Sequence, residues 1–182
     1  MTPEARQAIE TALWPTAGAA RSAPWVVFDC ARDPAVHRAL LASRLEFRCL
    51  YSGSIPRELE LVAPHLVELP FGHRLAQQWL DDGWGASWGV ALRTSAPDDL
   101  RHQLRKLLRV NGPDGRKLLF RWYDPRVLRA FLPTADAVQR RGFFGDIEAW
   151  HAEDGTGGLL EFRLDSRGAV QRRAVQSAAV PA

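Results

Sequence analysis

The sequence contains few residues that could form cross-links or hold a metal. Its 182 residues include two cysteines, Cys30 and Cys49, each inside an apolar stretch. Two isolated cysteines make neither a disulfide framework nor a zinc site, and small buried thiols are common in protein cores. The five histidines show no metal-ligand spacing with one another or with cysteine. We therefore expect no metal, no cofactor and a reducing compartment.

Long apolar runs are absent from the sequence. No segment approaches the roughly 20 apolar residues that a transmembrane helix needs. Residues 1–6 lack the charged and apolar regions of a secretory signal peptide. Together with the cysteine usage, these features predict a cytoplasmic protein that has no membrane partner.

The glycine-rich stretch 83–89 superficially resembles a nucleotide-binding loop. It follows a predicted helix and precedes a predicted strand, however. A dinucleotide loop must follow a strand, so that the N-terminus of the next helix meets the pyrophosphate. The favoured interpretation is that these glycines let two large indole rings turn and pack closely.

Asp124 is the strongest candidate for a catalytic acid. It lies at a predicted strand end beside Tyr123 and Arg126, and active residues are often found at such ends. An aspartate before a proline is also an excellent helix N-cap, which is the interpretation that we favour. We expect no catalytic residue, but a small enzyme with a dispersed active site around Asp124 and Tyr123 remains the main alternative to a binding protein.

The net charge of +3 is small but unevenly distributed. From Arg101 to Arg129 there are nine lysines and arginines against two acids, Asp114 and Asp124. A solvated basic face is the favoured interpretation, and a surface for an acidic partner is the alternative. A nucleic-acid-binding module that uses segment 101–129 is less favoured, because cationic amphipathic helices more often cover a sheet and leave their arginines in water.

The hydrophobic pattern alternates between helical and strand-like segments. Asp33 and Asp124 each precede a proline, which is typical of an N-cap followed by the first helical residue. Helices are predicted at residues 3–13, from 34 onward, and at 57–63, 74–80, 98–109, 125–132 and 134–141. Strands are predicted at residues 25–28, 47–51, 65–69, 88–92 and 118–122.

Strands interleaved with helices predict an α/β fold, with a mixed sheet flanked by helices. The tail differs from the rest, because its three strand-like segments at 146–152, 159–164 and 169–175 are separated by turns. They predict a C-terminal antiparallel β-meander with one solvent-exposed face. We expect a single domain over residues 1–182, with a linker-like stretch at 15–24, a β-rich tail at 146–175 and a frayed end at 176–182.

Three segments occur in an order that resembles a known family. They are APHLVEL at 63–69; GWGASWG at 83–89 with LRHQLR at 100–105; and LFRWYDPRVL at 119–128 with FLPT at 131–134 and FFG at 143–145. In this order they resemble the adaptor-chaperone family of bacterial type VI secretion systems, long catalogued only as a domain of unknown function. The resemblance covers about residues 25–150, and its most specific parts are the second and third segments taken together.

The resemblance implies a non-enzymatic protein. Members of that family bind a toxic effector in the cytoplasm, through the effector's N-terminal or adaptor-binding region, and help to load it onto the C-terminal region of the trimeric spike protein VgrG. Many members continue into a longer, largely helical C-terminal region. This sequence has a strand-rich tail instead, so effector contacts made by such a region would be missing or replaced.

A protein of this kind needs a rigid scaffold and an exposed surface that covers part of its client. Aromatic residues dominate interface energies, and arginines pair with acids on a partner and set the register of binding. The alternative is that most of the aromatic residues belong to the core and preserve the fold. The expected partner contacts are Trp84, Trp88, Arg121, Trp122, Tyr123, Asp124, Arg126 and Arg129.

Overall fold

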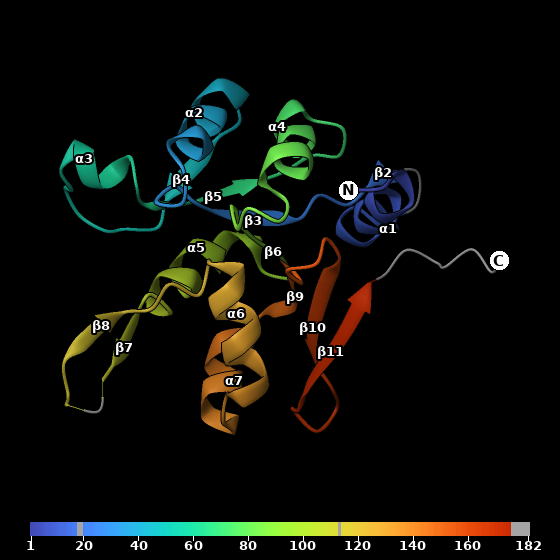
Figure 1. Cartoon of the computed structure of the whole chain (residues 1–182). Helices are drawn as coiled ribbons and strands as arrows, with labels where there is room; N and C mark the ends of the chain where they lie inside the picture. The colour runs from blue at the N-terminus through green and yellow to red at the C-terminus, as the bar shows by residue number, and fades with distance from the viewer. Residues whose placement is uncertain (18–19, 113, 176–182) are drawn as a thin grey trace.

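The computed structural model describes residues 1–17, 20–112 and 114–175 (Figure 1). A seven-stranded sheet forms its centre. The strands are β3 (Trp25–Asp29), β4 (Phe47–Cys49), β5 (Pro64–Glu68), β6 (Gly89–Thr94), β9 (Ile147–Glu153), β10 (Leu159–Leu164) and β11 (Val170–Val175). Their spatial order is β11-β10-β9-β6-β3-β5-β4, which places β3 and β6 near the middle.

The α/β class, the flanking helices and the C-terminal meander of β9, β10 and β11 are confirmed. Within the sheet, each pairing between described strands is antiparallel, so the parallel pairs implied by a mixed sheet are not found there. The reason is topological. The segment from β3 to β5 passes through β4 at the sheet edge before it returns, which lets β5 run against β3.

Helices cover both faces of the sheet (Figure 1). One layer contains α1 (Pro3–Leu13), α2 (Pro34–Ser43) and α4 (Arg74–Gln78), which continues into a π-helical turn at Trp79–Gly83. The other contains α5 (Pro97–Lys106), α6 (Pro125–Phe131) and α7 (Ala137–Phe144). A short α3 (Arg57–Glu60) lies near the β4 edge. No helix in the described part of the chain is long and apolar enough to cross a bilayer.

Two separate cores explain the continuous apolar run in β3. Val26 and Phe28 pack with the α1, α2 and α4 layer, whereas Val27 packs with the α5, α6 and α7 layer. Successive side chains of a strand point to opposite faces, so a strand covered on both faces is apolar throughout. The predicted strand at 25–28 is therefore present and is buried on both faces.

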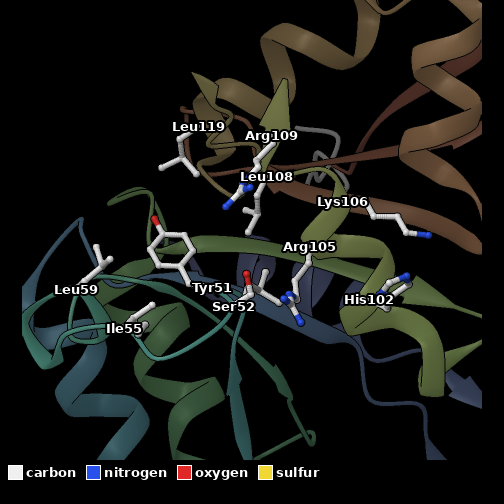
Figure 2. Close-up of a pocket in the computed structure, with 11 residues that line it drawn as sticks. Tyr51, Ser52, Ile55, Leu59, His102, Arg105, Lys106, Leu108, Arg109 and Leu119 are labelled. Atoms are coloured by element: carbon white, nitrogen blue, oxygen red, sulfur yellow. The ribbon is translucent and has the colours of Figure 1, made fainter. Parts of the chain in front are cut away.

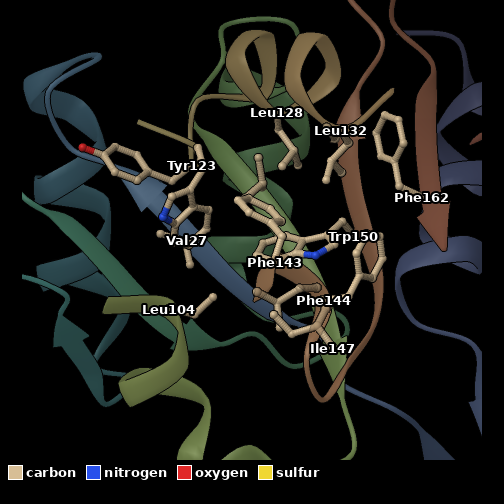
Figure 3. Packing of buried hydrophobic residues seen from close by; sticks show 14 of the residues in the cluster. Val27, Leu104, Tyr123, Leu128, Leu132, Phe143, Phe144, Ile147, Trp150 and Phe162 are labelled. Atoms are coloured by element: carbon tan, nitrogen blue, oxygen red, sulfur yellow. The ribbon is translucent and has the colours of Figure 1, made fainter. Parts of the chain in front are cut away.

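An aromatic cluster fills the α5, α6 and α7 side of the sheet (Figure 3). Trp150 of β9 packs edge-on against Trp122, with ring centroids 5.3 Å apart, and contacts Phe143 of α7 at 5.0 Å. Figure 3 also shows Leu128 and Leu132 reaching toward this cluster from above. The cluster joins helices that follow β6 to a strand from the C-terminal meander.

The predicted strand at 118–122 is wrong in its extent and its place. Residues Lys117–Leu119 form β8, which pairs with β7 (Arg109–Asn111) in a two-stranded hairpin outside the main sheet. Leu118 and Leu119 are about half exposed, at 49% and 53%. The apolar pattern of this segment therefore serves a surface hairpin, while Trp122 leaves the strand and enters the core.

The linker-like stretch at 15–24 contains two short paired strands, β1 (Thr16–Ala17) and β2 (Ala20–Arg21). Helix α1 ends just before it, with Ile9 and Leu13 buried against the core. The division into a single domain with a β-rich tail stays a prediction. The expected frayed end at 176–182 lies outside the described residues.

Candidate partner-binding site

Asp29 joins two of the sequence blocks at the end of β3. Its backbone N–H donates to the carbonyl of Trp88 at 2.7 Å, and its carboxylate accepts from the Arg121 guanidinium at 2.5 Å. The Asp29 side chain is completely buried. Burial raises the pKa of Asp29, although the Arg121 hydrogen bond and charge act in the opposite direction. The sequence offered one signal for this residue, an acid at the end of an apolar strand.

Asp124 is a helix cap, as favoured from the sequence. Its carboxylate accepts from the backbone N–H of Arg126 at 3.0 Å, and from the Arg126 guanidinium at 2.6 Å. Burial alone would raise the pKa of Asp124, but these hydrogen bonds outweigh it and hold the pKa below its ordinary value. The residue is therefore an ionised cap that begins α6 and orients one arginine.

Tyr123 lies in the core, at 2% exposure. Burial raises the pKa of Tyr123 far above its ordinary value, and a hydrogen bond shared with Tyr51 raises it further. A phenol with such a pKa stays protonated at neutral pH and is a poor base. Both residues of the alternative active site thus have structural roles: Asp124 caps α6, and Tyr123 is buried in the core.

In the block GWGASWG at 83–89, the indole ring of Trp88 packs against Gly83. Trp88 is 4% exposed, and a Cβ at Gly83 would lie 2.6 Å from its ring. Trp84 is partly buried and packs edge-on against Trp79, with centroids 5.3 Å apart. The interpretation that the glycines allow close packing of indoles is confirmed at Gly83.

Residues 85–89 of the same block also fit the Gly-x-Ser-x-Gly pattern of a nucleophile elbow. Ser87 has a positive φ of 60°. Its hydroxyl donates to the Glu153 carboxylate at 2.9 Å, and the N–H of Gly85 donates to the same carboxylate at 2.6 Å. Ser87 is buried, it precedes a strand rather than a helix, and no histidine hydrogen-bonds to it in the described residues. Glu153 thus clamps the loop as a structural anchor.

The three expected arginines lie at or near the surface. Arg121 and Arg126 have side chains 41% and 49% exposed, although each is held by one buried aspartate. Arg129 is half-buried and donates to the backbone carbonyl of Glu153 at 3.0 Å. Of the eight expected contacts, Trp84, Arg121, Arg126 and Arg129 retain exposed surface.

The other four expected contacts do not fit an exposed anchor. Trp88, Trp122, Tyr123 and Asp124 are each less than 5% exposed. A partner could touch them only if the fold opened, so here the core interpretation describes them better. Trp122, Tyr123 and Asp124 support the surface indirectly, because the segment that contains them, residues 119–128, also carries the exposed Arg121 and Arg126.

A groove that sequence reasoning missed is lined by Tyr51, the hydrogen-bond partner of Tyr123 (Figure 2). It is a groove of about 600 Å³ between the segment after β4 and the α5–β7–β8 region. We call it the basic groove. Its lining residues are Leu50, Tyr51, Ser52, Ile55, Leu59, His102, Arg105, Lys106, Leu108, Arg109 and Leu119.

The basic groove is lined by cations and apolar side chains, with no carboxylate among its lining residues. Arg105, Lys106 and Arg109 form no ion pair within the described part of the chain. Leu59 and Leu119 are exposed at 41% and 53%. The basic segment 101–129 was the available signal, but nothing in the sequence placed residues 51–59 opposite it.

The described residues contain no cluster of three or more histidine, cysteine or acidic side chains that could hold a metal ion. The cysteines are free thiols, Cys30 buried and Cys49 half-buried. Burial raises the pKa of Cys30 to about 12, which keeps it protonated at neutral pH. The Cys30 thiol is therefore a poor nucleophile at neutral pH.

Comparison with known proteins places the site inside a stretch of the chain that a family model matches. A family model described as a domain of unknown function, DUF4123, matches residues 24–142. This range includes the three sequence segments except FFG at 143–145. It also includes the Asp29–Arg121 pair and all of the basic groove. No curated protein and no solved structure matches the chain.

Proposed function

The chain belongs to the DUF4123 family, and from this we propose that it is a non-enzymatic adaptor that binds a type VI secretion effector and promotes its loading onto the VgrG spike. The client contact would involve the effector's N-terminal or adaptor-binding region, and the spike contact would involve the C-terminal region of VgrG. Both contacts would take place in the cytoplasm.

The basic groove is the observation that carries this proposal. It is an uncovered surface inside the family-matched range, and it combines aliphatic side chains with cations that form no ion pair in the described residues. Exposed apolar residues grouped on one surface are typical of protein–protein interaction sites and ligand-binding grooves. The half-exposed Arg121 and Arg126 add a second charged surface on the same family block.

The structural roles of the candidate catalytic residues give further support. Asp124 caps α6, Tyr123 is buried with a raised pKa, and Ser87 is bound to Glu153. Each of these contacts stabilises the fold and leaves no free nucleophile–base pair among these three residues. This favours a binding protein over a small enzyme centred on Asp124 and Tyr123.

Co-purification tests the proposal most directly. The tagged chain would be co-expressed with the protein encoded beside it and with the C-terminal segment of the spike, followed by size-exclusion chromatography. We expect a stable complex that raises the soluble yield of the effector. If the chain elutes alone as a folded protein and the effector is equally soluble without it, the adaptor function is wrong.

A further inference from the structure

We propose that the basic groove binds an acidic amphipathic helix. The apolar residues of this helix would contact Leu59 and Leu119, and its acidic residues would pair with Arg105 and Arg109. Identifying this helix as part of a secretion effector rests on the proposed function. Binding of an acidic amphipathic helix to the groove does not depend on the proposed function, so this binding can be tested separately.

The apolar side of the groove is built by two segments far apart in the sequence. Tyr51, Ile55 and Leu59 come from the segment that follows β4, and Leu119 comes from β8 (Figure 2). Leu59 and Leu119 remain 41% and 53% exposed, although the deeper Leu50 and Leu108 are buried. A partner with an apolar stripe would cover the exposed leucines, which a small polar metabolite would not.

The cationic side is built by the end of α5 and by β7. Figure 2 shows Arg105, Lys106 and His102 on the opposite side of the groove from Leu59 and Ile55. Arg109 pairs across the hairpin with Leu119, so one face of the hairpin presents both a cation and an aliphatic chain. The acids of α3, Glu58 and Glu60, do not line the groove. The surface therefore lacks the negative charge that an acidic partner would supply.

The adjacency of apolar and cationic side chains along the groove selects the shape of the partner. A ligand must present apolar groups along one stripe and carboxylates along the adjacent one, as a helix does with residues at positions i, i+3, i+4 and i+7. Single-stranded nucleic acid would also meet the cations, but it binds by stacking bases on aromatic rings. Tyr51 and His102 are the two rings in the lining, and its remaining apolar residues are aliphatic.

The walls of the groove are held in place by contacts behind it. Arg101 donates to the Cys49 carbonyl at 2.9 Å, which ties α5 to the end of β4. The N–H of Phe120 donates to the Leu108 carbonyl at 2.8 Å, which ties β8 to the end of α5. A preformed groove lowers the entropic cost of binding, so the site is suited to a partner helix without rearrangement of the backbone.

The test uses the full chain and three fluorescent probes in anisotropy titrations. The first is an amphipathic helical peptide of about 18 residues, roughly five turns, with a leucine stripe flanked by glutamates. The second replaces each glutamate with lysine, and the third is a single-stranded DNA with the same negative charge as the first. We expect the glutamate peptide to bind at least about tenfold more tightly than the lysine peptide, and more tightly than the DNA.

Matched variants locate the binding. Arg105→Glu with Arg109→Glu should weaken the glutamate peptide by about tenfold or more, whereas Arg38→Glu with Arg167→Glu, exposed positions outside the groove lining, should change it less than about twofold. Leu119→Ser should also weaken binding. Leu118→Ser is its control, because Leu118 is its neighbour in β8, is similarly exposed and does not line the groove. Melting temperatures check that each variant is folded.

The results separate the groove from the adaptor function. Equal binding of the two peptides, tighter binding of the DNA, or no loss in the Arg105/Arg109 variant would overturn the groove proposal. If the chain forms no complex with effector or spike but binds the glutamate peptide through these residues, the adaptor function fails and the groove stands. If the Arg105/Arg109 variant still holds the effector with full affinity and neither it nor the wild type prefers the glutamate peptide, the adaptor function stands and the groove proposal fails.

Discussion

The guanidinium of Arg121 contacts the buried carboxylate of Asp29 at 2.5 Å, although the two residues are 92 positions apart in the sequence. This pair attaches the segment after β8 to the end of β3, where Trp88 is also bound through the Asp29 N–H. The two segments that make the family resemblance most specific therefore meet at one aspartate.

Arg121→Ala should lower the free energy of unfolding by about 2 kcal/mol at pH 7, because it leaves the Asp29 carboxylate buried without its partner. The figure is below that for a fully buried pair, since Arg121 is partly exposed. Urea unfolding measures the loss. Arg116→Ala is the control, because the Arg116–Asp114 pair lies at the surface and should contribute less than about 0.5 kcal/mol.

The same variant should show a distinctive pH dependence. The folded-state pKa of Asp29 is raised by burial, so its protonated form favours folding, and this contribution is lost as the pH rises through the folded-state pKa. Without Arg121 the pKa should rise further. The difference in the free energy of unfolding between wild type and Arg121→Ala should therefore shrink as the pH is lowered. Adding Asp29→Asn to the Arg121→Ala variant should restore part of the lost stability. A difference that grows toward acid pH would contradict this account.

Glu161→Gln should remove part of the stability at neutral pH. The buried His151 hydrogen-bonds to Glu161 at 3.0 Å and lowers the pKa of that carboxyl, and Arg163 acts in the same direction. Ionised Glu161 thus stabilises the fold above the unfolded-state pKa, and the contribution is lost as the pH falls through the folded-state value. We expect a loss of about 2 kcal/mol at pH 7 that diminishes below about pH 4.5.

Urea unfolding at a series of pH values measures this effect. Glu148→Gln provides the control, because Glu148 lies exposed on the same strand, β9, and should change stability by less than about 0.5 kcal/mol. A Glu161 variant whose stability follows the wild type in parallel at every pH would show that the His151 contact does not shift the titration.

Gly83→Ala should destabilise the protein by about 2 kcal/mol, because the new Cβ would lie 2.6 Å from the Trp88 ring and 2.8 Å from the Trp79 ring. Both rings are buried and have little room to move. Gly142→Ala is the matched control in α7, where a Cβ meets nothing within 4 Å. It should stabilise the protein by about 0.5 kcal/mol through helix propensity. Thermal unfolding distinguishes the two signs.

Trp122→Ala should mainly reduce stability, whereas Trp84→Ala should mainly reduce binding of the effector. Trp122 is fully buried, so its removal should cost about 3–5 kcal/mol of stability. Trp84 retains exposed surface, so its removal should cost about 1 kcal/mol and reduce binding of the effector if it contacts the client. Urea unfolding curves measure the stability of both variants. Co-elution with the effector measures binding, at a temperature below the melting temperature of each variant. Loss of stability without loss of binding in Trp84→Ala would assign this indole to the core.

Local signals in the sequence were sufficient for much of the fold. An aspartate before a proline predicts the caps at Asp33 and Asp124 because the carboxylate bonds to backbone N–H groups only two residues away. The apolar run of β3 and the turn-separated tail predict a buried strand and a meander by side-chain periodicity. The resemblance of residues 25–150 likewise depends on residue order alone, and the match over 24–142 agrees with it.

The tertiary structure decided where these elements meet. Segment 118–122 is apolar enough for a core strand, yet its first residues form an exposed hairpin because Lys117–Leu119 pair with Arg109–Asn111 rather than with the sheet. Trp122 and Tyr123 could be interface anchors by composition, and packing buries them. The basic groove needs residues 51–59 opposite α5, and only long-range strand pairing places them there, because contacts between distant segments leave no periodic trace in either segment.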